Sequence, residues 1–394
     1  MEYKEKKPMG IYVHIPFCVK KCDYCDFVSQ TPDSALLVDD YLKALRAELL
    51  NAPEKYGFKT EEYETATIYI GGGTPSILEG YMIEDIVGVI RDRYSVKSDA
   101  EITIEMNPGT VSEDKLSAYK NAGINRVSIG LQSANDDELK LLSRIHDHGT
   151  FLKCFDMVRE AGFDNINVDI MTALPGQDEE KLLRTLNAVT ALSPSHISAY
   201  SLIIEENTPF YERYSKGGSL HDTLPDEESE RALYHLAVKQ LALFGYDQYE
   251  ISNFSLKDKY SRHNVSYWKR TPYIGAGLNA SSLMGNIRYR NTSDMQKYIA
   301  DPLSDACFDE KIRLTRDDEM DETMFLGLRM IEGVNAECFK DLYGVSMYEI
   351  YGSEIDKLRC LGLLFDDGLS VRMTERGIDY GNYVFSCFLR GQGV

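Results

Sequence analysis

The chain has 394 residues, enough for a core of about 200–250 residues and one or two smaller units. Its formal net charge is −20, from 43 basic and 63 acidic residues, which excludes nucleic acid as a partner and leaves at most peripheral membrane contact. No run of about 18 apolar residues indicates a membrane span, and the charged beginning lacks the apolar segment of a secretory signal. We therefore expect a cytoplasmic protein whose eight cysteines are thiols or metal ligands rather than disulfides.

Short β-branched or aromatic runs alternate with amphipathic helical patterns through the first half of the chain. The expected strands lie at 11–16, 66–72, 101–108, 126–132, 165–176 and 196–203, and the clearest helical patterns lie at 36–50, 82–94 and 179–192. Six such alternations predict a parallel sheet joined by right-handed crossovers, either an open sheet or a barrel that closes partly. In both arrangements, functional groups gather at the carboxyl ends of the strands.

The rest of the chain has a different character. Residues 207–300 are rich in tyrosine and loops, whereas residues 301–394 show several helical patterns followed by a β-hairpin pattern at 363–374 with Asp367-Gly368 at its turn. Helices followed by a hairpin are typical of a DNA-binding winged helix. Residues 301–394 carry 19 acidic and 10 basic residues, however, so we expect no binding of nucleic acid.

The segment HIPFCVKKCDYCDF (14–27) follows the first expected strand and holds three cysteines in C-x3-C-x2-C spacing. These are Cys18, Cys22 and Cys25. Three thiolates bind three irons of a [4Fe–4S] cluster, so the fourth iron stays open for a small molecule. The amino and carboxylate groups of S-adenosylmethionine (SAM) suit that open iron. A zinc site would need Asp26 or His14 as its fourth ligand, and the spacing fits zinc motifs poorly.

With this motif the sequence resembles the radical-SAM superfamily, in which an aromatic residue, here Tyr24, also precedes the last cysteine. The resemblance implies an α/β fold, with a six-stranded partial (β/α) barrel of the radical-SAM type and a smaller, mostly helical C-terminal domain. We expect a radical-SAM core at 1–215, a family extension at 216–300 and a helical, winged-helix-like domain at 301–394.

Further motifs resemble the oxygen-independent coproporphyrinogen III oxidase family. They are YVHIPFC, GGGTPS, IEMNPG, RVSIGLQS and NVDIMTALPGQ, together with an Arg-x-His pair at 144 and 146. The resemblance implies a SAM site lined by Tyr12, Tyr24, Gly72, Gly73, Thr74 and Glu105. It also places Gln132, Arg144 and Asp169 at positions that contact a second SAM in the oxidase.

Several of these residues have a purely structural interpretation as well. Glu105 and Asp169 end expected strands, where carboxylates often cap the following helix. Arg144 could form a surface ion pair, which contributes little to stability. The glycines could mark an ordinary tight turn, because glycine tolerates positive φ angles. The sequence leaves these alternatives open.

Two departures from the oxidase match the heme chaperone branch of the same family. Phe27 stands where the oxidase has a fourth cysteine. Moreover, only ten residues precede the first expected strand, whereas the oxidase has a longer N-terminal arm. In addition, His263-Asn264 and Tyr267-Trp268 match the H-N-x-x-Y-W motif that is linked to heme in that branch. Imidazole is a common heme ligand, and aromatic faces stack on the macrocycle. The alternative is that His263 is a hydrogen-bonded loop histidine.

The favoured hypothesis is a heme chaperone that binds a [4Fe–4S] cluster, SAM and heme and delivers heme to a client protein. The first alternative is the oxidase, which decarboxylates coproporphyrinogen III to protoporphyrinogen IX, and the second is a non-catalytic metal-binding structural module. Whether the chain catalyses a reaction is left open. Lys20 and Lys21, beside Cys22, suggest an acidic electron donor such as a flavodoxin as a further partner.

Overall fold

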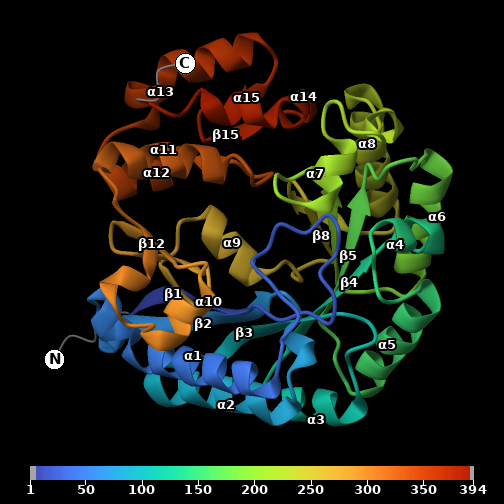
Figure 1. The fold of residues 1–394 in the computed structure, drawn as a ribbon. Coiled ribbons are helices and arrows are strands. Elements are labelled where there is room, and N and C mark those ends of the chain that lie inside the picture. The colour runs from blue at the N-terminus through green and yellow to red at the C-terminus, as the bar shows by residue number, and fades with distance from the viewer. Residues whose placement is uncertain (1–5, 391–394) are drawn as a thin grey trace.

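The computed structural model describes residues 6–390, which are built around one large sheet with a parallel centre (Figure 1). The central strands are β1 (Lys7–Ile15), β2 (Tyr63–Gly72), β3 (Val96–Met106), β4 (Arg126–Gln132), β5 (Ile166–Thr172) and β6 (His196–Ser201). They lie side by side in chain order and all run parallel. The predicted α/β class and all six predicted strands are therefore confirmed.

The helices between these strands cover the outer face of the sheet. They are α1 (Ala35–Tyr56), α2 (Gly80–Arg93), α3 (Glu113–Asn121), α4 (Asp136–Leu141), α5 (His148–Glu160) and α6 (Glu179–Ala191). Figure 1 shows α1, α2 and α3 next to one another along that face. Short 3₁₀ turns lie at Thr60–Glu62, Pro75–Ile77, His221–Thr223 and Asp305–Cys307. None of the helices within residues 6–390 combines the length and apolar character that crossing a membrane requires.

Helix α1 is longer than its sequence pattern indicates, since it continues past residue 50 through Pro53 to Tyr56. A proline inside a helix has no N–H and leaves the carbonyl four residues earlier, that of Leu49, without its helical donor. The Tyr94 hydroxyl, at the end of α2, donates to this carbonyl at 2.6 Å. A tertiary contact thus replaces the missing helical hydrogen bond.

The two faces of the central sheet differ in chemistry. Successive side chains of a strand point to opposite faces. On β3, Ile102 and Ile104 join the apolar core under the helices, whereas Thr103 and Glu105 point to the inner face. The inner face is polar yet buried along several strands. Its buried polar residues include Thr67, Thr103, Arg126, Ser128, Asn167, His196 and Ser198. Burying polar groups costs free energy unless they find hydrogen-bond partners. The many polar side chains on the inner face therefore point to a functional site there.

Later segments extend this sheet at both edges. At one edge, β9 (Tyr273–Ala276) pairs parallel with β1, followed by the antiparallel strands β10 (Ser281–Met284), β11 (Ile287–Asn291) and β12 (Phe308–Arg313). At the other edge, β8 (Asn253–Ser255) pairs antiparallel with β6, and β7 (Asp247–Glu250) pairs with β8. The accompanying helices are α7 (Pro209–Tyr214), α8 (Glu227–Leu243), α9 (Arg262–Trp268) and α10 (Met295–Ala300). β1 is therefore an interior strand.

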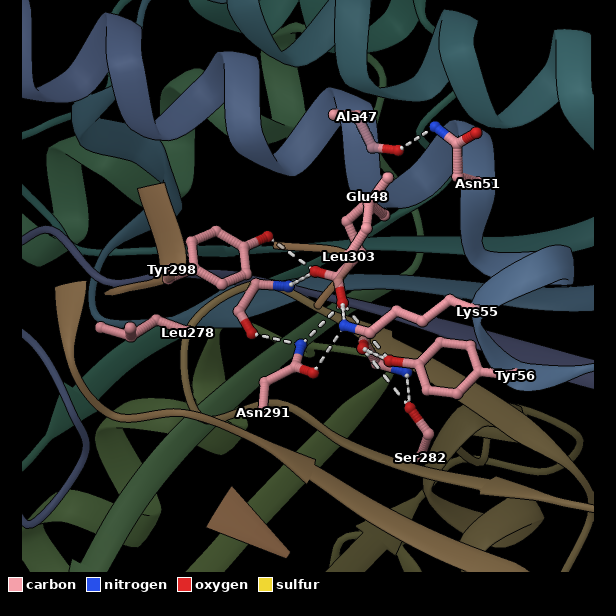
Figure 2. Close-up of polar contacts among 12 residues, drawn as sticks. Ala47, Glu48, Asn51, Lys55, Tyr56, Leu278, Ser282, Asn291, Tyr298 and Leu303 are labelled. Carbon is pink, nitrogen blue, oxygen red and sulfur yellow. Dashed lines mark hydrogen bonds and ion pairs between the residues drawn. The ribbon is translucent and has the colours of Figure 1, made fainter. Parts of the chain in front are cut away.

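A buried carboxylate joins this extension to the first helix (Figure 2). Glu48 on α1 is fully buried and forms an ion pair with Lys55 at 2.6 Å. The same carboxylate accepts hydrogen bonds from Tyr298 on α10 at 2.6 Å and from Asn291 on β11 at 2.8 Å. The N–H of Gly277, just after β9, donates to it at 2.8 Å. A buried charge is tolerated when it is paired and its lone pairs are satisfied, as here.

The C-terminal segment packs around its own apolar cluster and forms the stack at the top of Figure 1. Its elements are α11 (Arg316–Gly327), β13 (Val334–Asn335), α12 (Ala336–Tyr343), α13 (Met347–Cys360), β14 (Leu364–Asp366), β15 (Ser370–Met373), α14 (Glu375–Asp379) and α15 (Gly381–Ser386). The expected hairpin is present as β14 and β15, with Gly368 at φ 80° in its turn. β12 lies beyond residue 300, where the C-terminal domain is expected to begin, but it belongs to the main sheet. The three domain boundaries given above stay predictions.

Candidate functional site

A cavity of about 440 Å³ opens at the carboxyl ends of the central strands, and we call it the cysteine cavity. Of the predicted site residues it is lined by Cys18, Cys22, Tyr24, Cys25, Gly72, Gly73, Thr74, Glu105, Gln132, Arg144 and Asp169. Residues that are far apart in the sequence thus meet at one place, as parallel strands require. Tyr12 and His263 do not line this cavity.

The cysteine-bearing loop follows β1 and is closed at its base by backbone hydrogen bonds. The N–H of Cys18 donates to the Gln30 carbonyl at 3.0 Å, and the N–H of Gln30 donates to the Pro16 carbonyl at 2.9 Å. Farther along the loop, Asp23 forms an ion pair with Arg213 on α7 at 2.5 Å. Both ends and the middle of the loop are therefore attached to the rest of the fold.

Two groups outside the loop donate to its sulfur atoms. The Thr74 hydroxyl lies 3.5 Å from Cys18 Sγ, and Arg144 Nη1 lies 3.6 Å from Cys22 Sγ. Arg144 also donates to the Gly130 carbonyl at 2.8 Å, so within residues 6–390 its hydrogen bonds go to this carbonyl and to Cys22 Sγ, not to a carboxylate. The alternative of a surface ion pair for Arg144 is therefore wrong. Donors of this kind stabilise thiolate charge.

The glycines at the end of β2 are required by close approach to this loop. A Cβ on Gly73 would lie 2.9 Å from Cys18 Sγ and 2.8 Å from the Phe17 carbonyl oxygen. Gly72 has φ 118°, and a Cβ there would lie 2.7 Å from the His14 ring. A side chain at Gly73 would fill the space beside the Cys18 thiol, whereas one at Gly72 would collide with His14. The glycines thus form a cradle for a group held by the cysteines.

The donor set fits a [4Fe–4S] cluster. All eight cysteines are free thiols, and the three loop cysteines line one cavity. Among residues 6–390, no three Cys, His, Asp or Glu side chains lie close enough together to bind one metal ion. A [4Fe–4S] cluster does not need this closeness, because each thiolate binds a separate iron. Both His14 nitrogens are engaged, by the Tyr12 hydroxyl and the Val28 carbonyl at 3.0 Å each, so His14 does not point a free nitrogen toward a zinc ion.

Two half-buried carboxylates, Glu105 and Asp169, form the floor of the cysteine cavity. Glu105 accepts hydrogen bonds from the Tyr69 hydroxyl at 2.8 Å and from the N–H of Gly72 at 3.1 Å. Burial, together with the nearby charge of Asp169, raises the pKa of Glu105 to about 7. Neither carboxylate caps a helix, because Ser112 and Asp178 cap the helices that follow their strands. Glu105 and Asp169 are therefore available to a ligand.

Asp169 and Gln132 are held in place by local features of their strands. Ser128 and Asn167 donate to Asp169 at 3.0 and 2.7 Å, and burial raises its pKa. Gln132 has φ 73°, a left-handed conformation that only a few per cent of non-glycine residues adopt. The pairing register with β5 shifts at the same place. This irregularity turns the Gln132 side chain into the cavity.

A second cavity of about 420 Å³ lies beside the first, and we call it the aromatic cavity. It is lined by Tyr12, His14, Phe27, Val28, Tyr267, Trp268, Arg270, Tyr273, Asn279, Ala280, Ser281, Leu283, Arg288 and Leu326. Phe27 is 59% exposed and lines both cavities. The predicted SAM residue Tyr12 thus lies on the neighbouring cavity, while the second half of the H-N-x-x-Y-W motif forms one of its walls.

His263 lies on helix α9, not in a loop, and is only 1% exposed. Its Nδ1 is 2.8 Å from the Thr67 hydroxyl and its Nε2 is 2.8 Å from the Tyr267 hydroxyl. Burial lowers the pKa of His263 to about 3, so the ring is neutral. Because both nitrogens are engaged, ligation of heme by His263 would require the Tyr267 hydroxyl to move away.

The site contains residues that the motifs did not indicate. Tyr69, Ser128 and Tyr200 line the cysteine cavity from the inner faces of β2, β4 and β6. Their signal in the sequence is alternation, since each lies at an inward position of its strand. The Asp23–Arg213 contact had no signal, because the two residues are 190 positions apart.

Comparison with known proteins agrees with this geometry. The Radical SAM superfamily matches residues 12–189, and the HemN C-terminal domain matches residues 314–380. Coproporphyrinogen III oxidase (HemN) from Escherichia coli has a similar fold, with a TM-score of 0.83 over 97% of this chain and 90% of that chain at 23% identity.

Relatives in the curated proteins are more similar in sequence. The chain is 37% identical to the heme chaperone HemW of Bacillus subtilis, over 96% of this chain and 98% of the relative. It is 34% identical to HemW of Lactococcus lactis, over 98% of each chain, and 38% identical to HemW of Escherichia coli, over 69% of each chain. The chain therefore belongs to the HemW family of the radical SAM superfamily.

Proposed function

We propose that this chain is a heme chaperone that holds a [4Fe–4S] cluster and SAM in the cysteine cavity, binds heme in the aromatic cavity and delivers heme to a client protein. The observation that carries the proposal is Phe27. It replaces the fourth cysteine of the oxidase and opens onto both cavities. The HemW name of the relatives, as heme chaperones, supports the same conclusion.

The aromatic cavity suits an extended apolar macrocycle. Phe27, Tyr267 and Tyr273 offer apolar faces, and the rings of Tyr267 and Tyr273 pack edge to face at 4.6 Å. Its volume lies within the range of about 300–1,000 Å³ that is usual for ligand pockets. Binding there would place heme next to the cysteine-bearing loop, because Phe27 is shared.

In the cysteine cavity, the chain's residues would position two groups. A [4Fe–4S] cluster with an open iron binds the amino and carboxylate groups of SAM and supplies an electron to it. Cys18, Cys22 and Cys25 would hold the cluster, and Thr74 and Arg144 would donate to their sulfurs. Glu105 and Asp169 would attract the cationic SAM from the cavity floor.

The cysteine assignment is tested by two serine substitutions. Cys22→Ser should lose most of the bound iron and the visible absorbance of the reconstituted protein, because serine is a poor iron ligand in such clusters. Cys338→Ser, at an exposed position on α12, is the control and should keep both. Equal iron content in the two variants would contradict the assignment.

The Glu105 assignment predicts a pH dependence of SAM binding. With a pKa of about 7, Glu105 is mostly neutral at pH 6 and mostly a carboxylate at pH 8, so it attracts a cation only at the higher pH. The affinity for SAM should rise up to about tenfold over this range. Glu105→Gln should lack this contribution to the rise in affinity. Any pH dependence of SAM binding that remains in the variant then belongs to the ligand itself. An unchanged profile in that variant would exclude Glu105 from the site.

An acidic electron donor such as a flavodoxin is the second proposed protein partner, beside the client that accepts heme. Lys20 and Lys21 are exposed at the mouth of the cysteine cavity, and Lys21 Nζ donates to the Phe27 carbonyl at 2.9 Å. Reduction by flavodoxin should slow at least several-fold in Lys20→Glu plus Lys21→Glu, and should depend on salt. The control pair Lys153→Glu plus Lys239→Glu, on α5 and α8, carries the same charge change. Equal rates in both pairs would exclude this docking site.

The heme proposal is tested by an anaerobic heme titration of the cluster-reconstituted protein. We expect saturable binding of about one heme per chain. Ser281→Trp would fill the aromatic cavity and should weaken binding at least about tenfold, whereas Ser353→Trp, exposed on α13, should not. Absence of saturable binding, with consumption of coproporphyrinogen III in the presence of SAM and a reductant, would favour the oxidase instead.

The same titration decides the role of His263. His263→Ala removes the hydrogen-bond partner of Thr67 and Tyr267, so heme loss in this variant alone does not separate ligation from positioning. Tyr267→Phe leaves the imidazole in place and relieves its Nε2 of the hydroxyl. Heme affinity that is kept or increased in Tyr267→Phe supports ligation by His263, and weakened binding supports positioning.

A further inference from the structure

One wall of the aromatic cavity carries two arginines from different elements. Arg270 follows α9 and Arg288 lies on β11, and both line the cavity. Both arginines form ion pairs with Glu322 of α11. One carboxylate oxygen lies 2.8 Å from Arg270 Nε, and the other lies 2.8 Å from Arg288 Nη2. The side chains of Arg270, Arg288 and Glu322 are 11%, 28% and 12% exposed.

Glu322 explains why two like charges can lie together in a largely buried place. Two adjacent guanidinium groups repel, and a carboxylate that bridges them offsets this repulsion. Glu322 itself does not line the cavity, so it approaches the arginines from behind. Glu319 of the same helix also approaches Arg270, at 3.7 Å. A guanidinium has five N–H donors, and Glu322 accepts from one nitrogen of each arginine. Arg270 Nη1 also donates to the Tyr343 hydroxyl at 3.2 Å, so Arg288 has more donors left for a ligand than Arg270 has.

The backbone at Arg270 is unusual in a way that serves this arrangement. Its φ is 52°, a left-handed conformation that non-glycine residues seldom adopt. The turn is held by hydrogen bonds from the Arg270 N–H to the Tyr267 carbonyl at 3.1 Å and from the Thr271 N–H to the Ser266 carbonyl at 2.8 Å. Strained conformations of this kind persist where the surroundings fix them, and they cluster at ligand sites.

We propose that Arg270 and Arg288 form a carboxylate-binding pair, which selects a ligand that carries two carboxylates at one edge of an apolar ring. The inference rests on the proposed function, and it assigns the two propionates of heme to this wall while the macrocycle lies against Phe27 and Tyr267. Arginine binds carboxylates through two parallel N–H···O bonds, so it suits this task better than lysine. Glu322 is a positioning residue that keeps the two side chains together.

The test compares two ligands that differ only at these carboxylates. Hemin and its dimethyl ester are titrated into the cluster-reconstituted protein from the same solvent. The wild-type protein should bind hemin at least about tenfold more tightly than the ester, because a buried charge-assisted hydrogen bond is lost with each carboxylate. In Arg288→Leu the ratio of hemin affinity to ester affinity should fall at least several-fold, because only Arg270 remains to bind a carboxylate.

The controls separate binding from folding. Arg290→Leu changes the same strand two residues farther on, where the side chain lies 3.6 Å from Glu310 and does not line the aromatic cavity, so it should keep the preference for hemin. Arg288→Lys keeps the positive charge near Glu322 and should keep part of the preference even if Arg288→Leu unfolds. Loss of the whole preference in Arg290→Leu, or full preference in Arg288→Leu, would overturn the inference.

The outcomes also distinguish this inference from the proposed function. If neither hemin nor its ester binds the wild-type protein, the heme chaperone proposal fails, and the carboxylate pair fails with it. If both ligands bind with equal affinity, heme binding stands, but the assignment of its propionates to Arg270 and Arg288 is overturned.

Discussion

The buried carboxylate of Glu48 is the interaction on which the position of the aromatic cavity depends (Figure 2). Its hydrogen bonds to Tyr298, Asn291 and Gly277 attach α10, β11 and the end of β9 to helix α1. Removing one partner of a buried ion pair typically costs about 3–5 kcal/mol, because the remaining charge is left uncompensated. This attachment reinforces the pairing of β9 with β1, which places the residues at 267–288 next to the cysteine-bearing loop.

β1 then serves both cavities, because it is an interior strand with the cysteine-bearing loop at its end. The two cavities are also connected across the sheet. The Tyr69 hydroxyl donates to Glu105 in the cysteine cavity, and its ring stacks on that of His263 at 5.1 Å. His263 in turn contacts the hydroxyl of Tyr267, which lines the aromatic cavity. Besides the shared Phe27, the packed side chains of Tyr69, His263 and Tyr267 therefore connect the two cavities.

Local patterns in the sequence were sufficient to predict the strands and the position of the cysteine cavity. Alternation and strand-end motifs can be recognised within a few residues. They could not give contacts between distant segments. Glu48 and Tyr298 are 250 positions apart, and nothing near either residue indicates the other. The extension of α1 through Pro53 depends on a hydroxyl from α2. The hydrogen bond between His263 on α9 and Thr67 on β2 likewise joins distant segments, so the motif alone could not show that both nitrogens of His263 are engaged.

The surroundings of α9 show how the H-N-x-x-Y-W segment shapes the aromatic cavity. Glu101 on β3 accepts hydrogen bonds from the N–H groups of Arg262 and His263 at 3.0 Å each, which fixes the beginning of the helix to the inner face of the sheet. The helix is only seven residues long, so its last residues and Arg270 lie close to this anchor. The walls of the aromatic cavity are therefore set by the same buried polar face that carries Glu105. A substitution of Glu101 should therefore alter the aromatic cavity, although Glu101 itself lines neither cavity.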